Sequence, residues 1–131
     1  YVAHYDAAKL ALTVRENLAF WAELHGGGDV MAGLAAFDLE KLASLPARFL
    51  SAGQRRRLAL ARLIAIKAGI WLLDEPSVAL DAVSLDSLRG LIAAHRRDGG
   101  AVVASTHAEL GLDDAENLDV STFAGQRAAA S

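Results

Sequence analysis

The succession of apolar runs and polar breaks predicts a helix early in the chain. Thr13 can cap a helix, and Glu16, three residues later, can reach back to complete a capping box. The helix that starts there is predicted to run to about His25 and to stop at the three glycines 26–28. Residues 1–3, Tyr-Val-Ala, have the pattern of the end of a preceding strand.

Two further helices are predicted before the middle of the chain. Asp29 is placed to cap a helix that reaches about Phe37, and Asp38 is placed to cap a short third one. Residues 45–49 are then expected to form a connecting loop, because Pro46 disfavours helix in the residue before it.

After this loop the chain alternates helices with short apolar runs. The run 70–73, Ile-Trp-Leu-Leu, is continuous and lies between Gly69 and Pro76, which predicts a strand covered on both faces in a parallel sheet. The predicted elements are a helix over 51–66, a strand over 70–73, a helix over 83–97, a second covered strand over 101–104 and a further candidate strand over 117–123. This alternation is typical of a doubly wound α/β layer.

Composition and charge narrow the class of protein. The 131 residues suffice for one domain, and the absence of cysteine fits a reducing compartment and excludes disulfides and thiolate metal sites. No signal peptide and no span of a bilayer are expected. The net charge of −3 gives no general attraction to nucleic acid, although residues 55–57 form a local cluster of arginines. Since the chain begins at Tyr1 without an initiator methionine, we expect it to be part of a longer one.

The first chemical signal is the acidic pair in IWLLDEP. Asp74 and Glu75 follow a buried strand, which is where open α/β sheets place their ligands. Asp74 could hold Mg²⁺ through water, and Glu75 could polarise an attacking water. For an isolated Asp-Glu pair, however, capping of the following helix is the more common explanation.

A second polar strand end follows at STH, residues 105–107. If the two strands are neighbours, His107 points into the same crevice as Glu75. A single histidine after a strand is usually an ordinary loop residue. Two polar strand ends, with Asp81 of SVALD between them, favour a shared site.

The third signal is FLSAGQRRRLALARL. Ser51 and Gly53 lie at the start of a predicted helix, where unpaired N–H groups and the helix dipole favour an anion such as phosphate. Gly53 allows close approach of that anion, and the Ser51 hydroxyl can donate to it. On spacing alone, a serine cap on a basic amphipathic helix is the better interpretation.

Taken in order, these motifs resemble those of one family. LSAGQ with RRRLALARL, then IWLLDEP, SVALD and STH, resemble the signature, Walker B, D-loop and switch histidine of ATP-binding cassette (ABC) ATPases. The stretch LTVRENLAFWAELHG, residues 12–26, is similar to the family's helical subdomain just after its Q-loop. The resemblance covers nearly the whole chain. It implies an α/β fold, the C-terminal part of a P-loop NTPase domain, in which a parallel sheet is flanked by helices and joined by a helical subdomain.

The same resemblance implies a division of the chain. The end of the Q-loop strand and the helical subdomain would occupy 1–50. The signature helix and the C-terminal half of the nucleotide-binding core would occupy 51–126, followed by a frayed tail over 127–131.

The resemblance further implies an ATPase that works as a head-to-tail dimer, in which the signature of one subunit closes over ATP held by the other. Asp74 would serve Mg²⁺, and Glu75 would be the general base. His107 would orient the γ-phosphate, and Asp81 would link the two sites across the interface. Nucleotide contacts are implied for Ser51, Ala52, Gly53 and Gln54, with His4 or Tyr5 at the Q-loop position.

Three features depart from the family pattern. No G-x-x-x-x-G-K-[ST] is present, because none of Lys9, Lys41 and Lys67 follows a glycine. That loop normally cradles the phosphates with backbone N–H groups and a lysine. His4-Tyr5 stands where the Q-loop glutamine is expected, and Ala52 stands where the signature more often has glycine.

Within the family, LSAGQ, LTVRENLAFWAELHG, WLLDEPSVALD and STHAELGL are similar to the ATP-binding subunits of haem exporters used in cytochrome c maturation. This implies a peripheral protein on the cytoplasmic face of the inner membrane. Its partners would be a second ATPase subunit and integral membrane subunits that dock near the Q-loop and residues 14–37. Two alternatives stay open: a non-catalytic half-site or dimerisation module, and an ABC ATPase that serves no transporter.

Overall fold

The computed structural model describes residues 8–112 and 114–124. Its main elements are the helices α1 (Val14–Leu24), α2 (Val30–Ala36), α3 (Ala52–Ala65), α4 (Ala82–Arg97) and α5 (Ser121–Ala124), the strands β1 (Ile70–Asp74) and β2 (Ala101–Ser105), and the 3₁₀ turns η1 (Glu40–Leu42) and η2 (Ala47–Phe49). The predicted strand over 1–3, the residues His4 and Tyr5, and the tail over 127–131 lie outside the described residues.

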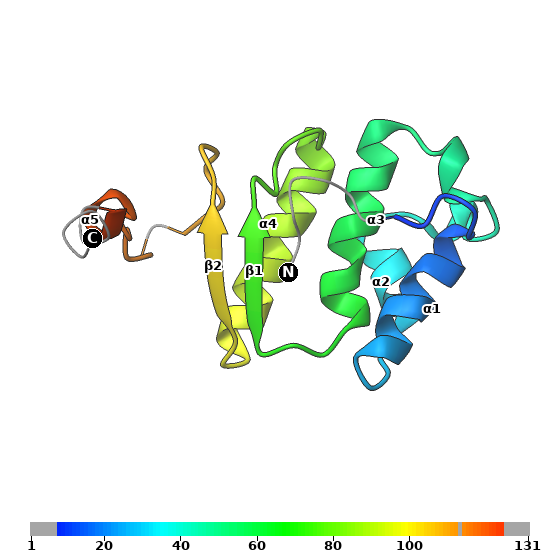
Figure 1. Cartoon of the computed structure of the whole chain (residues 1–131), viewed down its shortest axis with the longest axis horizontal. Helices are drawn as coiled ribbons and strands as arrows, with labels where there is room; N and C mark the ends of the chain where they lie inside the picture. Colours follow the sequence, from blue (N-terminus) through cyan, green and yellow to red (C-terminus); the bar gives the residue numbers. More distant parts are fainter. Residues whose placement is uncertain (1–7, 113, 125–131) are drawn as a thin grey trace, which may run out of the picture.

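The two strands are neighbours in a parallel sheet. Ile70 is paired with Ala101, and Asp74 with Ser105, so the strands are in register along their whole length. They are joined through α4, which lies behind both strands in Figure 1, while α1, α2 and α3 gather to one side. This arrangement confirms the predicted α/β order from residue 51 onward.

One apolar core joins the helices to the covered face of the sheet. Large side chains from several elements are fully buried in it, among them Leu18, Leu34, Leu60, Leu88 and Ile92. Within the helical group, α3 packs on both α1 and α2, which also contact each other.

The predicted helix starts at Thr13 and Asp29 are confirmed by their caps. The Thr13 hydroxyl accepts from the N–H of Glu16, whose carboxylate accepts from the N–H of Thr13 in return. The Asp29 carboxylate accepts from the N–H of Ala32 at the start of α2. The connecting loop over 45–49 contains a single 3₁₀ turn, which η2 provides.

Two local predictions were wrong. Asp38 does not cap a helix: its φ is 51°, a left-handed conformation that aspartate tolerates, and η1 begins after it without a side-chain cap. The candidate strand over 117–123 is also absent. The Asp119 carboxylate accepts from the N–H of Ser121 instead, and this local bond starts the short helix α5.

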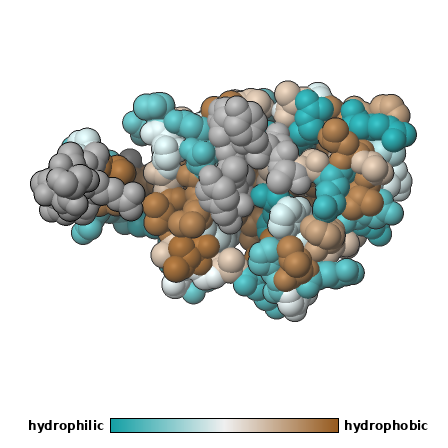
Figure 2. All heavy atoms as spheres, in the orientation of Figure 1, coloured by the Kyte–Doolittle hydropathy of each residue, from teal (hydrophilic) through white to brown (hydrophobic). Residues whose placement is uncertain are grey.

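The sheet is covered on one face rather than two in the part of the chain that the structure describes. On the covered face, the Trp71 ring stacks on the His95 ring of α4 at a centroid distance of 3.9 Å. On the other face Ile70, Leu72 and Val103 are 63%, 44% and 58% exposed. Figure 2 shows this face as apolar side chains gathered over the two strands. The apolar residues at both alternating positions led us to predict cover on both sides.

Candidate functional site

The sequence-predicted residues meet at one end of the molecule. The strands β1 and β2 end there, and α3 and α4 begin there, at the top of Figure 1. The described residues brought to this end are Ser51, Ala52, Gly53 and Gln54 before and in α3, Asp74 and Glu75 after β1, Asp81 before α4, and His107 after β2.

Glu75 has an unusual backbone conformation at the end of β1. Its φ is 44°, which few residues other than glycine adopt. Its N–H donates to the carbonyl of Ser105 at 2.8 Å, so the turn is tied to the neighbouring strand. Asp74, the last residue of β1, is partly buried beside Ser105.

The structure brings His107 and Glu75 together, as the sequence predicted. The Nε2 atom of His107 lies 3.5 Å from the Oε1 atom of Glu75, a contact that becomes an ion pair when the imidazole is protonated. The His107 side chain is 98% exposed, whereas that of Glu75 is 24% exposed. The carboxylate is therefore held at the protein surface, and the imidazole is free to meet a group that approaches from outside.

The start of α3 fits both interpretations of the stretch over 49–63, a serine cap on a basic helix and a binding site for an anion. The Ser51 hydroxyl accepts from the N–H of Gln54 at 3.2 Å, and the Gln54 side-chain oxygen accepts from the N–H of Ser51 at 2.8 Å. Gly53 packs closely, since a Cβ atom there would lie 3.1 Å from the carbonyl oxygen of Ala79. Ala52 occupies the exposed first position of the helix. The N–H groups of Ala52 and Gly53 have no partner within the helix and remain available to an anion.

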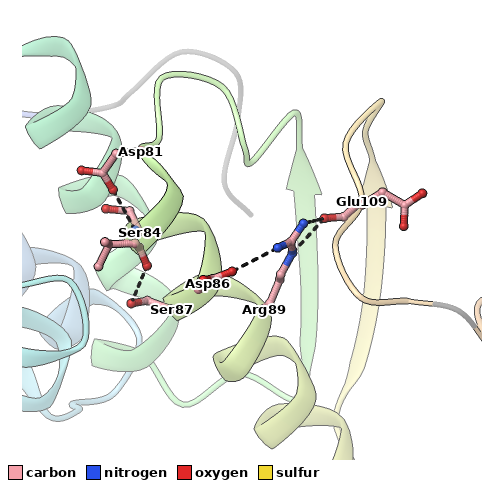
Figure 3. Close-up of polar contacts among 7 residues, drawn as sticks. Asp81, Ser84, Asp86, Ser87, Arg89 and Glu109 are labelled. Atoms are coloured by element: carbon pink, nitrogen blue, oxygen red, sulfur yellow. Dashed lines mark hydrogen bonds and ion pairs between the residues drawn. The ribbon is translucent and has the colours of Figure 1, made fainter.

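Asp81 caps α4. Its Oδ1 atom accepts from the N–H of Ser84 at 2.8 Å (Figure 3). Hydrogen bonds from the Ser84 backbone and side chain, with a smaller contribution from the positive charge of Arg57, lower the pKa of the Asp81 carboxyl. The carboxylate is exposed, so it can also meet a partner across an interface.

The helix α4 also fixes the segment that follows His107. The Arg89 guanidinium donates to the main-chain oxygen of Glu109 at 3.0 and 2.6 Å and to the Asp86 carboxylate at 3.0 Å (Figure 3). Sequence reasoning did not find Arg89, because an arginine in the middle of a helix gives no sign of a partner 20 residues away.

The three consecutive arginines of α3 each donate to different main-chain carbonyls. Arg55 donates to Leu50 at 2.7 Å, and Arg57 donates to Phe37 at 3.2 Å. Arg56 is only 3% exposed and donates from Nη2 to the carbonyl oxygens of Asp74, at 3.0 Å, and Glu75, at 2.7 Å. The sequence showed a local basic cluster, and the structure shows that its middle member is buried under the acidic pair.

The acidic pair fits a magnesium ion held largely by water and substrate. Among the described residues, no three His, Asp or Glu side chains converge on a metal position. Asp74 and Glu75 offer carboxylate oxygens, and Mg²⁺ commonly takes one or two of these while it keeps several waters and binds substrate phosphates. The donors present are thus suitable for Mg²⁺ bound together with a nucleotide.

Comparison with known proteins agrees with this geometry. The family model for ABC transporters matches residues 1–78. The chain belongs to the ABC transporter family. The cytochrome c biogenesis ATP-binding export protein CcmA of Rhodospirillum rubrum is 54% identical over 126 residues, which are 95% of this chain and 54% of that protein. The protein of the same name from Paracoccus denitrificans is 50% identical over 123 residues, with 94% and 59% covered.

Solved structures of the family share the fold. A dimeric ATP-binding cassette in a post-hydrolysis state, bound to ADP and Pi, superposes with a TM-score of 0.72 at 28% identity and matches 82% of this chain and 51% of that one. A second dimeric structure of a bacterial ABC transporter cassette superposes with a TM-score of 0.71 at 27% identity. The chain therefore spans between half and three fifths of the length of the relatives described.

Proposed function

We propose that this ABC-family chain forms part of an ATPase that hydrolyses Mg-ATP and couples hydrolysis to export of haem for cytochrome c maturation. The contact of 3.5 Å between Glu75 and His107, beside Asp74 at the carboxyl edge of the sheet, carries this proposal. The relatives named as ATP-binding export proteins of cytochrome c biogenesis support the choice of transporter.

In this mechanism Glu75 is the general base. Its carboxylate accepts a proton from a water molecule as the water oxygen attacks the γ-phosphorus, and the bond from that phosphorus to the β–γ bridging oxygen breaks. His107 donates from its imidazole to a γ-phosphate oxygen. Asp74 would hold Mg²⁺ through water, and the ion would neutralise phosphate charge. Most of the rate enhancement then comes from positioning and charge stabilisation.

The signature end of α3 serves the nucleotide of a second subunit in a head-to-tail dimer. Ser51 and Gly53 offer a hydroxyl and a backbone N–H to its γ-phosphate, with Ala52 and Gln54 completing the turn. Asp81 lies on the exposed start of α4 and meets the opposite subunit. The dimeric assembly of the related cassettes supports this arrangement.

The membrane subunits dock on α1 and α2 and on the segment of His4 and Tyr5, at the cytoplasmic face of the inner membrane. Within the described residues, no helix combines the length and apolar character needed to cross a membrane.

A change of Glu75 to glutamine tests the proposed chemistry in the ATPase assembled with its phosphate-binding loop and partner subunits. Glu75→Gln keeps the shape but removes the base, so we expect kcat to fall by about 10²-fold or more while ATP binding is retained. Phosphate release measures kcat, and nucleotide titration measures binding. The matched control is Glu116→Gln, an exposed carboxylate in the segment between β2 and α5, which should retain full activity. Undiminished hydrolysis in Glu75→Gln would refute the role of Glu75.

A further inference from the structure

Arg56 holds the backbone of the acidic pair from a buried position. Its Nη2 atom donates to the carbonyl oxygens of both Asp74 and Glu75. An arginine residue that is 3% exposed loses most of the hydration of its guanidinium, and this loss must be offset by hydrogen bonds or charges inside the protein. An apolar side chain could fill the same space without losing hydration. Packing alone therefore does not explain why a charged arginine stands at position 56.

The conformation of Glu75 supplies a reason for such a contact. A left-handed φ of 44° at a residue with a Cβ atom is sparsely populated and persists when the surroundings fix it. Two bonds do so here, one on each side of the residue. The Glu75 N–H donates to Ser105 at 2.8 Å, and its carbonyl accepts from Arg56 at 2.7 Å.

We propose that Arg56 is a positioning residue that fixes the carboxylate of Glu75 for proton abstraction by clamping the Asp74–Glu75 backbone onto the signature helix α3. This inference rests on the proposed ATP hydrolysis. Arg56 touches neither the attacking water nor the nucleotide in this assignment. Its substitution therefore loosens the turn and lowers kcat, while the affinity for ATP is kept.

The first test is made without nucleotide, by hydrogen exchange of the intact protein. Arg56→Gln should speed exchange in the peptide over 70–76, which contains the Glu75 amide, and Arg56→Lys should give an intermediate rate. Arg96→Gln is the matched control. Its guanidinium pairs with the Asp114 carboxylate at 2.7 Å on the surface, and its loss should leave that peptide unchanged. Unchanged exchange in Arg56→Gln would overturn the clamp.

The second test is steady-state hydrolysis by the assembled ATPase. Arg56→Gln should lower kcat by about ten- to a hundredfold, since small misplacements of a catalytic group have effects of that size. The KM for ATP should stay within about twofold, and Arg56→Lys should recover part of kcat because an ammonium can reach one carbonyl. A kcat within twofold of the wild type, or a rise in KM alone, would overturn the proposal. So would loss of folding in both variants, which would show a purely structural role.

The two tests separate this inference from the function on which it rests. If the wild-type assembly does not hydrolyse ATP, the proposed function fails. The hydrogen-exchange experiment still tests whether Arg56 fixes the Asp74–Glu75 backbone. If Glu75→Gln abolishes turnover and Arg56→Gln leaves it intact, only the role of Arg56 fails.

Discussion

Single residues at this site have local roles that can be measured apart from any catalytic role. Asp81 is expected to act across a dimer interface, yet in the structure it already caps α4 through the N–H of Ser84. Ser51 likewise has a structural partner in Gln54. At both positions the cap leaves the proposed contact with a partner or phosphate geometrically possible, because a carboxylate or hydroxyl oxygen can take part in more than one hydrogen bond.

The cap formed by Asp81 predicts a pH dependence of stability. Hydrogen bonds from Ser84 lower the pKa of Asp81 in the folded state, so the carboxylate stabilises the fold above its ordinary pKa of about 4. That contribution is lost as the pH falls through the lowered value. Asn also caps helices but does not titrate. We therefore expect the wild type to lose more stability than Asp81→Asn between pH 6 and pH 2.5, measured by urea unfolding. Parallel losses in the two proteins would contradict this assignment, because all other carboxyls are shared.

At the scale of elements, the helical group depends on close backbone approach at its glycines. Gly28 lies between α1 and α2, where a Cβ atom would stand 1.6 Å from the carbonyl oxygen of Ala65 at the end of α3. Gly33, within α2, would place a Cβ atom 2.9 Å from the carbonyl oxygen of Ala61. The connection between α1 and α2 and the helix α2 can therefore lie against α3 only because both positions lack side chains.

This packing predicts the cost of a single methyl group. Gly28→Ala meets the backbone of Ala65 rather than a flexible side chain, so α3 and the loop must separate. We expect a loss of about 1–3 kcal/mol in the free energy of unfolding, the usual range for overpacking. Urea unfolding measures it. Gly69→Ala is the control, because no atom lies within 4 Å of a Cβ there and its φ is not left-handed, so it should change little. Equal stability of the two variants would argue against tight packing at Gly28.

The sequence was informative at this scale where the signal was local. The capping box at Thr13 and the serine cap at Ser51 were both predicted with the helices that they start. The return bond from Gln54, which makes the Ser51 cap a capping box, was not predicted. The contact of His107 with Glu75 could be predicted because parallel neighbours end at the same edge. The hydrogen bonds of Arg56 join residues that are 18 and 19 positions apart in the sequence. They depend on how α3 packs against the end of β1, which a local sequence pattern does not predict. The prediction of a helix cap at Asp38 was wrong because aspartate favours left-handed turns as well as helix caps.

For the whole molecule, two surfaces of the described part of the chain bear on its assembly. One face of the sheet exposes Ile70, Leu72 and Val103, and the signature end of α3 presents two unpaired N–H groups. The apolar pattern of both strands predicted that both faces of the sheet are covered. In the described residues, α4 covers one face and the other is exposed. The family match and the coverage of its relatives are consistent with a chain that carries one part of a larger nucleotide-binding unit.

This organisation predicts weak nucleotide binding by the 131-residue chain alone. The capping box engages the N–H groups of Ser51 and Gln54, so only those of Ala52 and Gly53 are left as backbone donors for phosphate at the start of α3. No lysine follows a glycine to form a phosphate-binding loop. We expect calorimetry to give a dissociation constant for Mg-ATP of about 1 mM or weaker, near 4 kcal/mol of binding free energy, and no turnover. The full-length Rhodospirillum rubrum relative, named as an ATP-binding protein, is the positive control. Micromolar affinity in the isolated chain would mean that a phosphate site exists among these residues and that the half-site interpretation is wrong.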